Sequence, residues 1–202
     1  MPKIYHIIRS NSANNLFKEI IQESLHSGLG DEFFISSGFF QEGNLSRYHV
    51  SSDVDSKNRN YINNPFRRNM TANIRGEHNR YNIRWHRGFV NFCNSLRNAG
   101  YSVVQNNINR THAKIFILQR NNIPFLEIIG SSNQTRPAYG SSSPFNKEAD
   151  LIICSDPTLQ NIISNIILNY QEISQGAIIL EYSEENKNSI INEMIWIRDN
   201  FF

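Results

Sequence analysis

The order of apolar patterns along the 202 residues predicts one α/β domain, in which a central β-sheet lies between layers of helices. Strand-like apolar runs alternate with segments in which apolar residues recur at helical spacing. A chain of this length can bury a real core as one domain, and no internal repeat divides it. We therefore treat residues 1–202 as a single domain.

Short runs of β-branched and aromatic residues predict strands at residues 4–8, 31–40, 101–105, 112–119, 124–130, 149–154 and 177–180. Helical spacing predicts helices over 13–27, from Trp85 to Gly100, over 157–170 and over 183–198. The glycines of Gly28-Leu29-Gly30 end the first helix. Asp156-Pro157 starts the third helix with a proline in its first turn, where the missing N–H costs nothing.

Residues from 41 to about 82 are rich in Asn, Ser and Arg and poor in aliphatic residues. Such a composition buries little, so we expect a long basic loop or insertion in the domain. Residues 43–120 hold thirteen basic and three acidic side chains, whereas residues 141–202 hold three basic and nine acidic ones. This asymmetry indicates a polyanionic partner, with a solvated basic loop as the alternative. The candidate nucleic-acid contacts are Arg67, Arg68, Arg75, Arg80, Arg84 and Arg87.

The two cysteines, Cys93 and Cys154, lie in apolar surroundings without metal-ligand spacing. We expect buried free thiols, as is usual in a reducing cytoplasm. His78, His86 and Cys93 do not approach a four-ligand zinc pattern. The N-terminus lacks the apolar core of a signal peptide, and no apolar run approaches the length of a membrane span. A cytoplasmic protein without membrane contact is therefore expected.

A histidine and a lysine two residues apart, His112 and Lys114, begin a run of β-branched and aromatic residues. In a strand, these two side chains project from the same face. An imidazole beside a fixed cation suits phosphoester chemistry, because one group forms the bond and the other balances the phosphate charge. A small polar turn with Ser131 and Asn133 follows the next apolar run, and Glu148 precedes the one after it. Asn133 and Glu148 are therefore expected near strand ends.

The succession of His-x-Lys, Gly-Ser-x-Asn and a downstream glutamate resembles the signature of the phospholipase D superfamily. Thr135 fits the Gly-Ser-x-Asn-x-Thr form that is common in its nucleases, and Asn-Lys-Glu-Ala at 146–149 is similar to its restriction endonucleases and small nucleases. The signature covers about residues 111–153, with a weaker likeness around 32–40. The resemblance implies a phospholipase D-like fold, with a central mixed β-sheet flanked by helices on both faces.

The resemblance also implies an active site. In the superfamily's mechanism a histidine attacks phosphorus, a lysine and an asparagine hold the non-bridging oxygens, and a glutamate orients the histidine. The matching residues are His112, Lys114, Asn133 and Glu148, and the candidate substrate-binding residues are Ser131, Thr135 and Arg136. No cofactor and no metal ion is implied. Because this chain holds one motif where larger members hold two, the resemblance implies a homodimer with the active site at the interface.

A metal-independent nuclease is the function that these features favour, acting on DNA rather than RNA, in restriction or phage defence. A partner protein could supply sequence specificity, because no separate recognition domain fits in this length. The longer signature has an aspartate five residues after the lysine, where this chain has Gln119, so a nucleic-acid-binding module with a decayed catalytic site stays open. A lipid phosphodiesterase is a further alternative, against which the arginine-rich region stands.

Each motif also has a purely structural interpretation. The His-x-Lys pair could lie on an exposed strand edge, where lysine discourages aggregation. The Gly-Ser-x-Asn sequence could be only a turn. Glu148 could pair with Lys147 or with Arg136 instead of a histidine.

Overall fold

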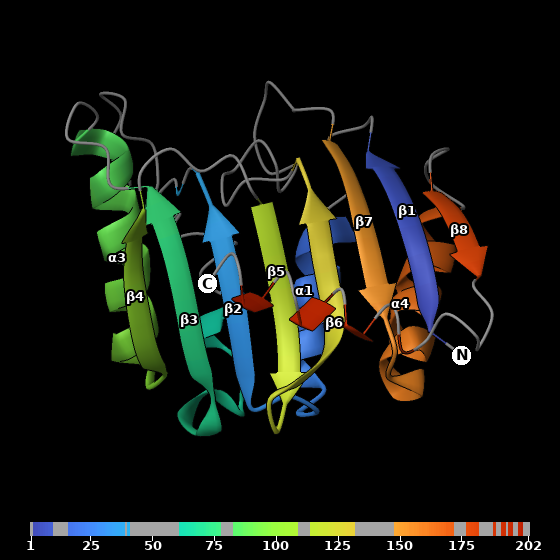
Figure 1. Cartoon of the computed structure of the whole chain (residues 1–202), viewed down its shortest axis with the longest axis horizontal. Helices are drawn as coiled ribbons and strands as arrows, with labels where there is room; N and C mark the ends of the chain where they lie inside the picture. The colour runs from blue at the N-terminus through green and yellow to red at the C-terminus, as the bar shows by residue number, and fades with distance from the viewer. Residues whose placement is uncertain are drawn as a thin grey trace.

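The computed structural model describes residues 2–9, 16–38, 40, 61–77, 83–108, 114–131, 148–171 and 177–181, and residues 188, 191–192, 194–195 and 198–199 near the C-terminus. Within this part of the chain, helices are interspersed among the strands, four of which follow one another from residue 102 to residue 154, and all strands belong to one sheet (Figure 1). The predicted α/β class is therefore confirmed.

The sheet has eight strands in the order β4-β3-β2-β5-β6-β7-β1-β8. The strands β2, β3 and β4 are parallel to one another, whereas the remaining neighbours pair antiparallel, so the sheet is mixed as expected. Their bounds are Lys3–Arg9 (β1), Glu32–Ser37 (β2), Thr71–Glu77 (β3), Ser102–Ile108 (β4), Lys114–Arg120 (β5), Ile123–Gly130 (β6), Glu148–Cys154 (β7) and Ala177–Glu181 (β8).

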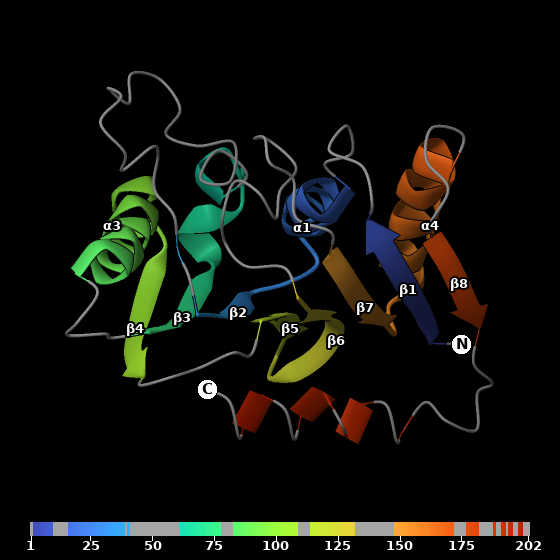
Figure 2. The ribbon, with the colours of Figure 1, turned by 90° about the horizontal axis from the view of Figure 1, so that it is seen from above.

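Three helices cover one face of the sheet: α1 (Leu16–His26), α3 (Ile83–Ala99) and α4 (Pro157–Gln171). Figure 2 shows them in one layer, with the described helical residues between 188 and 199 running across the opposite face. Helices therefore flank the sheet on both faces. At the start of α4, Asp156 Oδ1 accepts hydrogen bonds from the amides of Thr158 (2.9 Å) and Leu159 (3.0 Å), which caps the helix beside Pro157 as the sequence predicted.

The main core lies between the sheet and these three helices. One row of register partners across six strands is entirely apolar and buried, and consists of Ile74, Ile35, Phe116, Ile128, Ile152 and Tyr5. Because side chains alternate along a strand, the intervening residues face the other way. Phe34, Ile115 and Ile117 form a separate buried cluster on that second face. Ile153 packs there with Met194, one of the described residues between 188 and 199, which we call the C-terminal segment.

Part of the expected basic insertion is a strand, so the loop interpretation is wrong for residues 71–77. The strand β3 lies between β2 and β4, and Ala72 and Ile74 are fully buried. Tyr61 and Met70, which precede it, are also buried, and a short 3-10 turn, η1 (Arg67–Asn69), leads into the strand. Only two inward positions of β3 are apolar, so its period of two was hidden within the Asn- and Arg-rich composition. Residues 41–60 and 78–82 of the expected insertion lie outside the described residues.

A tight turn and a register shift together determine how β5 pairs with β6. The two turn residues, Asn121 and Asn122, have φ of 52° and 64°. Positive φ at both central positions is typical of the type I′ turn, which suits the twist of a two-residue hairpin and which asparagine tolerates. Between Leu118 and Gln119 the register shifts by one residue, so that the beginning of β5 lies beside the end of β6 and Lys114 pairs with Gly130.

Candidate active site

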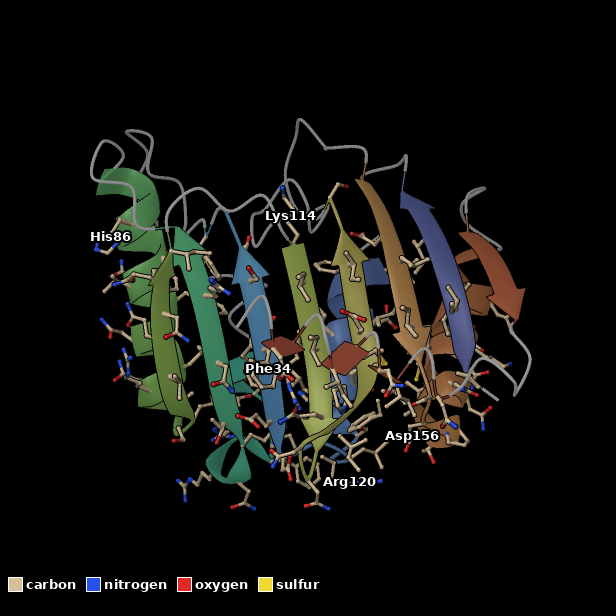
Figure 3. The ribbon with its side chains drawn as sticks, viewed as in Figure 1. Phe34, His86, Lys114, Arg120 and Asp156 are labelled. Carbon is tan, nitrogen blue, oxygen red and sulfur yellow. The ribbon has the colours of Figure 1, made fainter. Side chains whose placement is uncertain are left out.

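The predicted motif residues that the structure describes converge on one edge of the sheet. Lys114 begins β5, Ser131 directly follows β6, and Glu148 begins β7. The register pairs Lys114 with Gly130 and Gly130 with Asp150, so these strand ends lie side by side. We call this end of the central strands β5, β6 and β7 the Lys114 edge. Figure 3 shows Lys114 there and Arg120 at the opposite end of β5.

The helix-covered face changes character at the Lys114 edge. Ser36 pairs with Ile115, so the next register position sets Ser37 beside Lys114. The row there reads Ser37, Lys114, Gly130 and Asp150, two residues along each strand from the apolar row of the core. Ser37 is fully buried and Asp150 is 3% exposed, whereas Lys114 is half-buried. The sheet therefore carries a polar, largely buried floor at the edge where the sequence predicted phosphate chemistry.

Sequence reasoning missed two members of this polar floor, Ser37 and Asp150. Both were assigned to apolar strand runs, and neither belongs to the motif. The available signal was alternation: each has the same parity along its strand as buried apolar residues, Ile35 for Ser37 and Ile152 for Asp150. A polar residue at an inward position near a strand end marks a candidate site, because burial of a polar group must be compensated.

Several predicted site residues lie outside the described residues: His112, Asn133, Thr135, Arg136 and Arg80. The roles predicted for them therefore stay predictions. Glu148 is placed by its backbone, which pairs with Arg9 at the end of β1. Both residues belong to the Lys114 edge.

Gln119, which stands where the longer signature has an aspartate, lies far from the Lys114 edge. It is five residues along β5 from Lys114, which at about 3.3 Å per residue corresponds to about 16 Å. Its side chain is buried, its Nε2 donates to the Glu32 carboxylate, and its Oε1 accepts from Arg198 Nη1 at 3.0 Å. Position 119 therefore ties β5 to β2 and to the C-terminal segment.

An open cavity of about 410 Å³ adjoins this network on the face that the C-terminal segment crosses. Its lining includes Glu32, Gln119, Arg198 and Phe34. The polar groups of the lining bind one another, since Glu32 also accepts from Asn73 Nδ2 at 2.6 Å and Arg198 Nη1 also donates to the Asn122 carbonyl at 2.8 Å. We interpret this cavity as part of the attachment of the C-terminal segment.

The predicted arginines are spread over both ends of the sheet. Arg67 holds the end of α3, because its Nε donates to the Ala99 carbonyl and its Nη1 to the Asn64 carbonyl, each at 2.7 Å. Arg68 is exposed at the same end. Arg75 is half-buried on β3, two residues from the strand end that reaches the Lys114 edge, and its Nε has no hydrogen-bond partner. Arg84 and Arg87 belong to the beginning of α3.

Both cysteines are buried free thiols, as predicted. Burial raises the pKa of the Cys93 thiol and of the Cys154 thiol to about 12, so both stay neutral at physiological pH. Within the described ranges no group of three or more His, Cys, Asp or Glu side chains could hold a metal ion. None of the helices described for this chain has the length and apolar character needed to cross a bilayer.

The fold is similar to that of two solved proteins. Yeast tyrosyl-DNA phosphodiesterase 1 is 12% identical over 76% of this chain and 32% of its own, with a TM-score of 0.39. Phosphatidylserine synthase from Haemophilus influenzae is 12% identical over 98% of this chain and 46% of its own, with a TM-score of 0.49. This chain spans less than half the length of either protein. No family model and no curated protein sequence matches the chain.

Proposed function

We propose that this chain is a metal-independent phosphodiesterase that cleaves DNA through a phosphohistidine on His112. The observation that carries the proposal is the register of β5, β6 and β7. It places Lys114 beside Gly130, the residue before Ser131, and Gly130 beside the beginning of β7, which starts at Glu148. The His-x-Lys, Gly-Ser-x-Asn and glutamate motifs are separated in sequence, so a common edge supports one shared site. If the Gly-Ser-x-Asn sequence were only a turn, or the lysine only protected a strand from aggregation, the three motifs would not need to lie together.

In the proposed reaction, the His112 imidazole attacks phosphorus and the bond from phosphorus to the leaving oxygen breaks. The leaving oxygen takes a proton from the partner subunit's His112, which acts as general acid. Water then attacks the phosphorus of the phosphohistidine and gives a proton to the imidazole of the partner subunit's His112, and the phosphorus–nitrogen bond breaks. Lys114 and Asn133 stabilise the negative charge on the non-bridging oxygens, and Glu148 orients His112.

The proposed enzyme is a homodimer, because one chain supplies one motif histidine and the reaction needs both a nucleophile and an acid. The basic region between residues 43 and 120 supports a polyanionic substrate, and we propose DNA in restriction or phage defence. Sequence specificity would then come from a partner protein or from residues of the basic region.

The position of Gln119 argues against a decayed site. A substitution weakens the case for catalysis only where the altered residue could reach the substrate or the groups that hold it. Gln119 lies about 16 Å along β5 from Lys114, and its side chain is engaged by Glu32 and Arg198. The missing aspartate therefore removes no group from the Lys114 edge.

Cleavage of plasmid and single-stranded DNA in EDTA tests the proposal, with wild type compared with His112→Ala and Lys114→Met. We expect wild type to cut, His112→Ala to be inactive, and Lys114→Met to lose about 10²–10³-fold in rate, because a fixed cation is lost from the transition state. Arg120→Met is the matched control: it removes a cation from the exposed far end of the same strand and should cut normally.

Two further measurements separate the proposal from its rivals. Wild-type reactions quenched with alkaline detergent should contain His112 joined through phosphorus to a DNA end, detected by mass spectrometry after digestion of the DNA, and sizing should give a dimer. DNA binding that weakens with salt, without cleavage or a phosphohistidine, would instead indicate a binding module. Cleavage that requires Mg²⁺ and survives His112→Ala would exclude the proposed chemistry.

A further inference from the structure

The polar floor at the Lys114 edge contains a carboxylate that no motif includes. Asp150 has the same parity along β7 as Ile152 and Cys154, which belong to the main core, so it faces the helix-covered side of the sheet. Lys114 has the same parity along β5 as Phe116 and Leu118 of that core. The lysine and the aspartate therefore rise from the same face, in the same row.

Gly130 is the register partner of both residues and lies between them. Adjacent strands are about 4.8 Å apart, so the backbones of Lys114 and Asp150 are separated by about 10 Å. The four-carbon stem of lysine and the short side chain of aspartate span much of that gap. Because glycine has no side chain, nothing rises between the two charged groups from the strand that separates them.

We propose that Asp150 is a positioning residue for Lys114, holding the ammonium group over Gly130 where the substrate phosphate is bound; this rests on the proposed function. A lysine side chain is flexible, and a fixed counter-charge on the same face limits the directions in which its ammonium can point. Such preorganisation makes a cation effective in a transition state, because no reorganisation is needed during the reaction. Asp150 itself would not touch the phosphate, which repels it.

The elements around Asp150 carry few other charges. The strand β6 contributes Glu127, which pairs with Ile117 and faces the opposite side of the sheet. The helix α4 contains no Asp, Glu, Lys or Arg. The remaining charged or titratable residues on neighbouring elements are Lys3, His6 and Arg9 on β1, Glu148 on β7, and Lys18, Glu19, Glu23 and His26 on α1.

Acetylation of Lys114 by acetic anhydride, followed by mass spectrometry at fixed pH, tests the inference without requiring any cleavage activity. The reagent must reach the amine of Lys114, and a carboxylate that holds this group on one side limits that access. We expect Lys114 to be acetylated about three- to tenfold faster in Asp150→Asn than in wild type, because the flexible lysine side chain is then no longer held. Asp150→Glu keeps the charge and should react at close to the wild-type rate.

The matched control is Glu127→Gln, which also neutralises a fully buried carboxylate but on the other face of the sheet. It should leave Lys114 acetylation unchanged even if it lowers the melting temperature. If Asp150→Asn does not fold, Gly130→Ala carries the test, since its methyl group separates two charges that both remain and should also speed acetylation. Unchanged acetylation in the folded variant, or equal acceleration in Glu127→Gln, overturns the inference.

Cleavage kinetics then show whether the positioning matters for catalysis. In Asp150→Asn we expect kcat to fall about tenfold while KM changes little, because the lost orientation acts mainly in the transition state. Wild-type protein that does not cleave DNA would contradict the proposed function and leave the acetylation result to decide the inference by itself. Faster acetylation with unchanged kcat would refute the positioning role.

Discussion

Restoring the superfamily's aspartate by Gln119→Asp should destabilise the protein and should not improve catalysis. The Gln119 amide donates to the Glu32 carboxylate and accepts from Arg198, so it joins an acceptor to a donor. A carboxylate at this position can still accept from Arg198 but cannot donate to Glu32. The variant therefore replaces a hydrogen bond by the repulsion of two like charges in a buried place.

The expected cost follows from these contacts. A hydrogen bond to a charged group contributes about 1.5–3 kcal/mol. Like-charge repulsion adds to this loss, and the strengthened contact with Arg198 offsets part of it, so we expect a net loss of about 2–3 kcal/mol. For a domain of this size, each kcal/mol lowers Tm by about 2–4 °C, which gives a fall of about 4–12 °C.

Urea unfolding followed by circular dichroism measures this cost, with Gln119→Asn as the control because it has the shape of aspartate without the charge. We expect Gln119→Asn to lose less stability than Gln119→Asp at pH 7.5. The difference should narrow near pH 4.5, where a proton shared between the two carboxylates removes the repulsion. Equal stability of Gln119→Asp and wild type, or a gain in DNA cleavage, would refute the assignment of position 119 to the fold.

Three further changes test other parts of the structure. Asp156→Ala removes the cap of α4 and should cost about 1 kcal/mol in urea unfolding, without altering the slope of the transition. Gly76→Ala would place a Cβ 2.3 Å from the Phe89 ring and should cost about 1–3 kcal/mol, measured in the same way. Because burial raises the pKa of both thiols to about 12, Cys93 and Cys154 should resist iodoacetamide until the protein unfolds. Their contribution to stability is fully present below about pH 9, the ordinary thiol pKa, and is lost as pH rises from there towards 12, which alkaline unfolding curves should show.

The sequence predicted the fold well where apolar periodicity was strong. The helices around Ile20 and Phe92 and the motif strands were found, because their inward residues are large and recur at the expected period. The strand β3 was missed, since its inward positions hold Ala72 and Ile74 while Asn73 and Arg75 alternate with them. The Asn- and Arg-rich composition of the surrounding region concealed the short alternation of buried and exposed residues in β3. Pairing with β2 and β4 in the folded protein makes this segment a strand.

The site was predictable only as far as its motifs reached. Lys114 and Glu148 were recognised because their spacing matched a known signature, and the register then placed them at one edge. Asp150 carries no motif, and its significance depends on which residues lie beside it on neighbouring strands. Which residues lie beside Asp150 depends on the strand order, in which β5, β6 and β7 are neighbours. The spacing of residues within a single strand does not reveal it.

In the proposed function, the two ends of β5 have different roles, one in catalysis and the other in stability. Lys114 lies at the edge with the polar floor, Gln119 anchors the C-terminal segment, and four buried apolar residues separate them. Free-energy effects of sites more than about 7–10 Å apart usually add, unless a shared network couples them. The hydrogen bonds of the Gln119 side chain lead to Glu32 and Arg198, both away from Lys114. The loss of catalytic rate in Lys114→Met and the loss of stability in Gln119→Asp should therefore combine additively in the double variant, and a departure from additivity would show that the C-terminal segment is coupled to the active site.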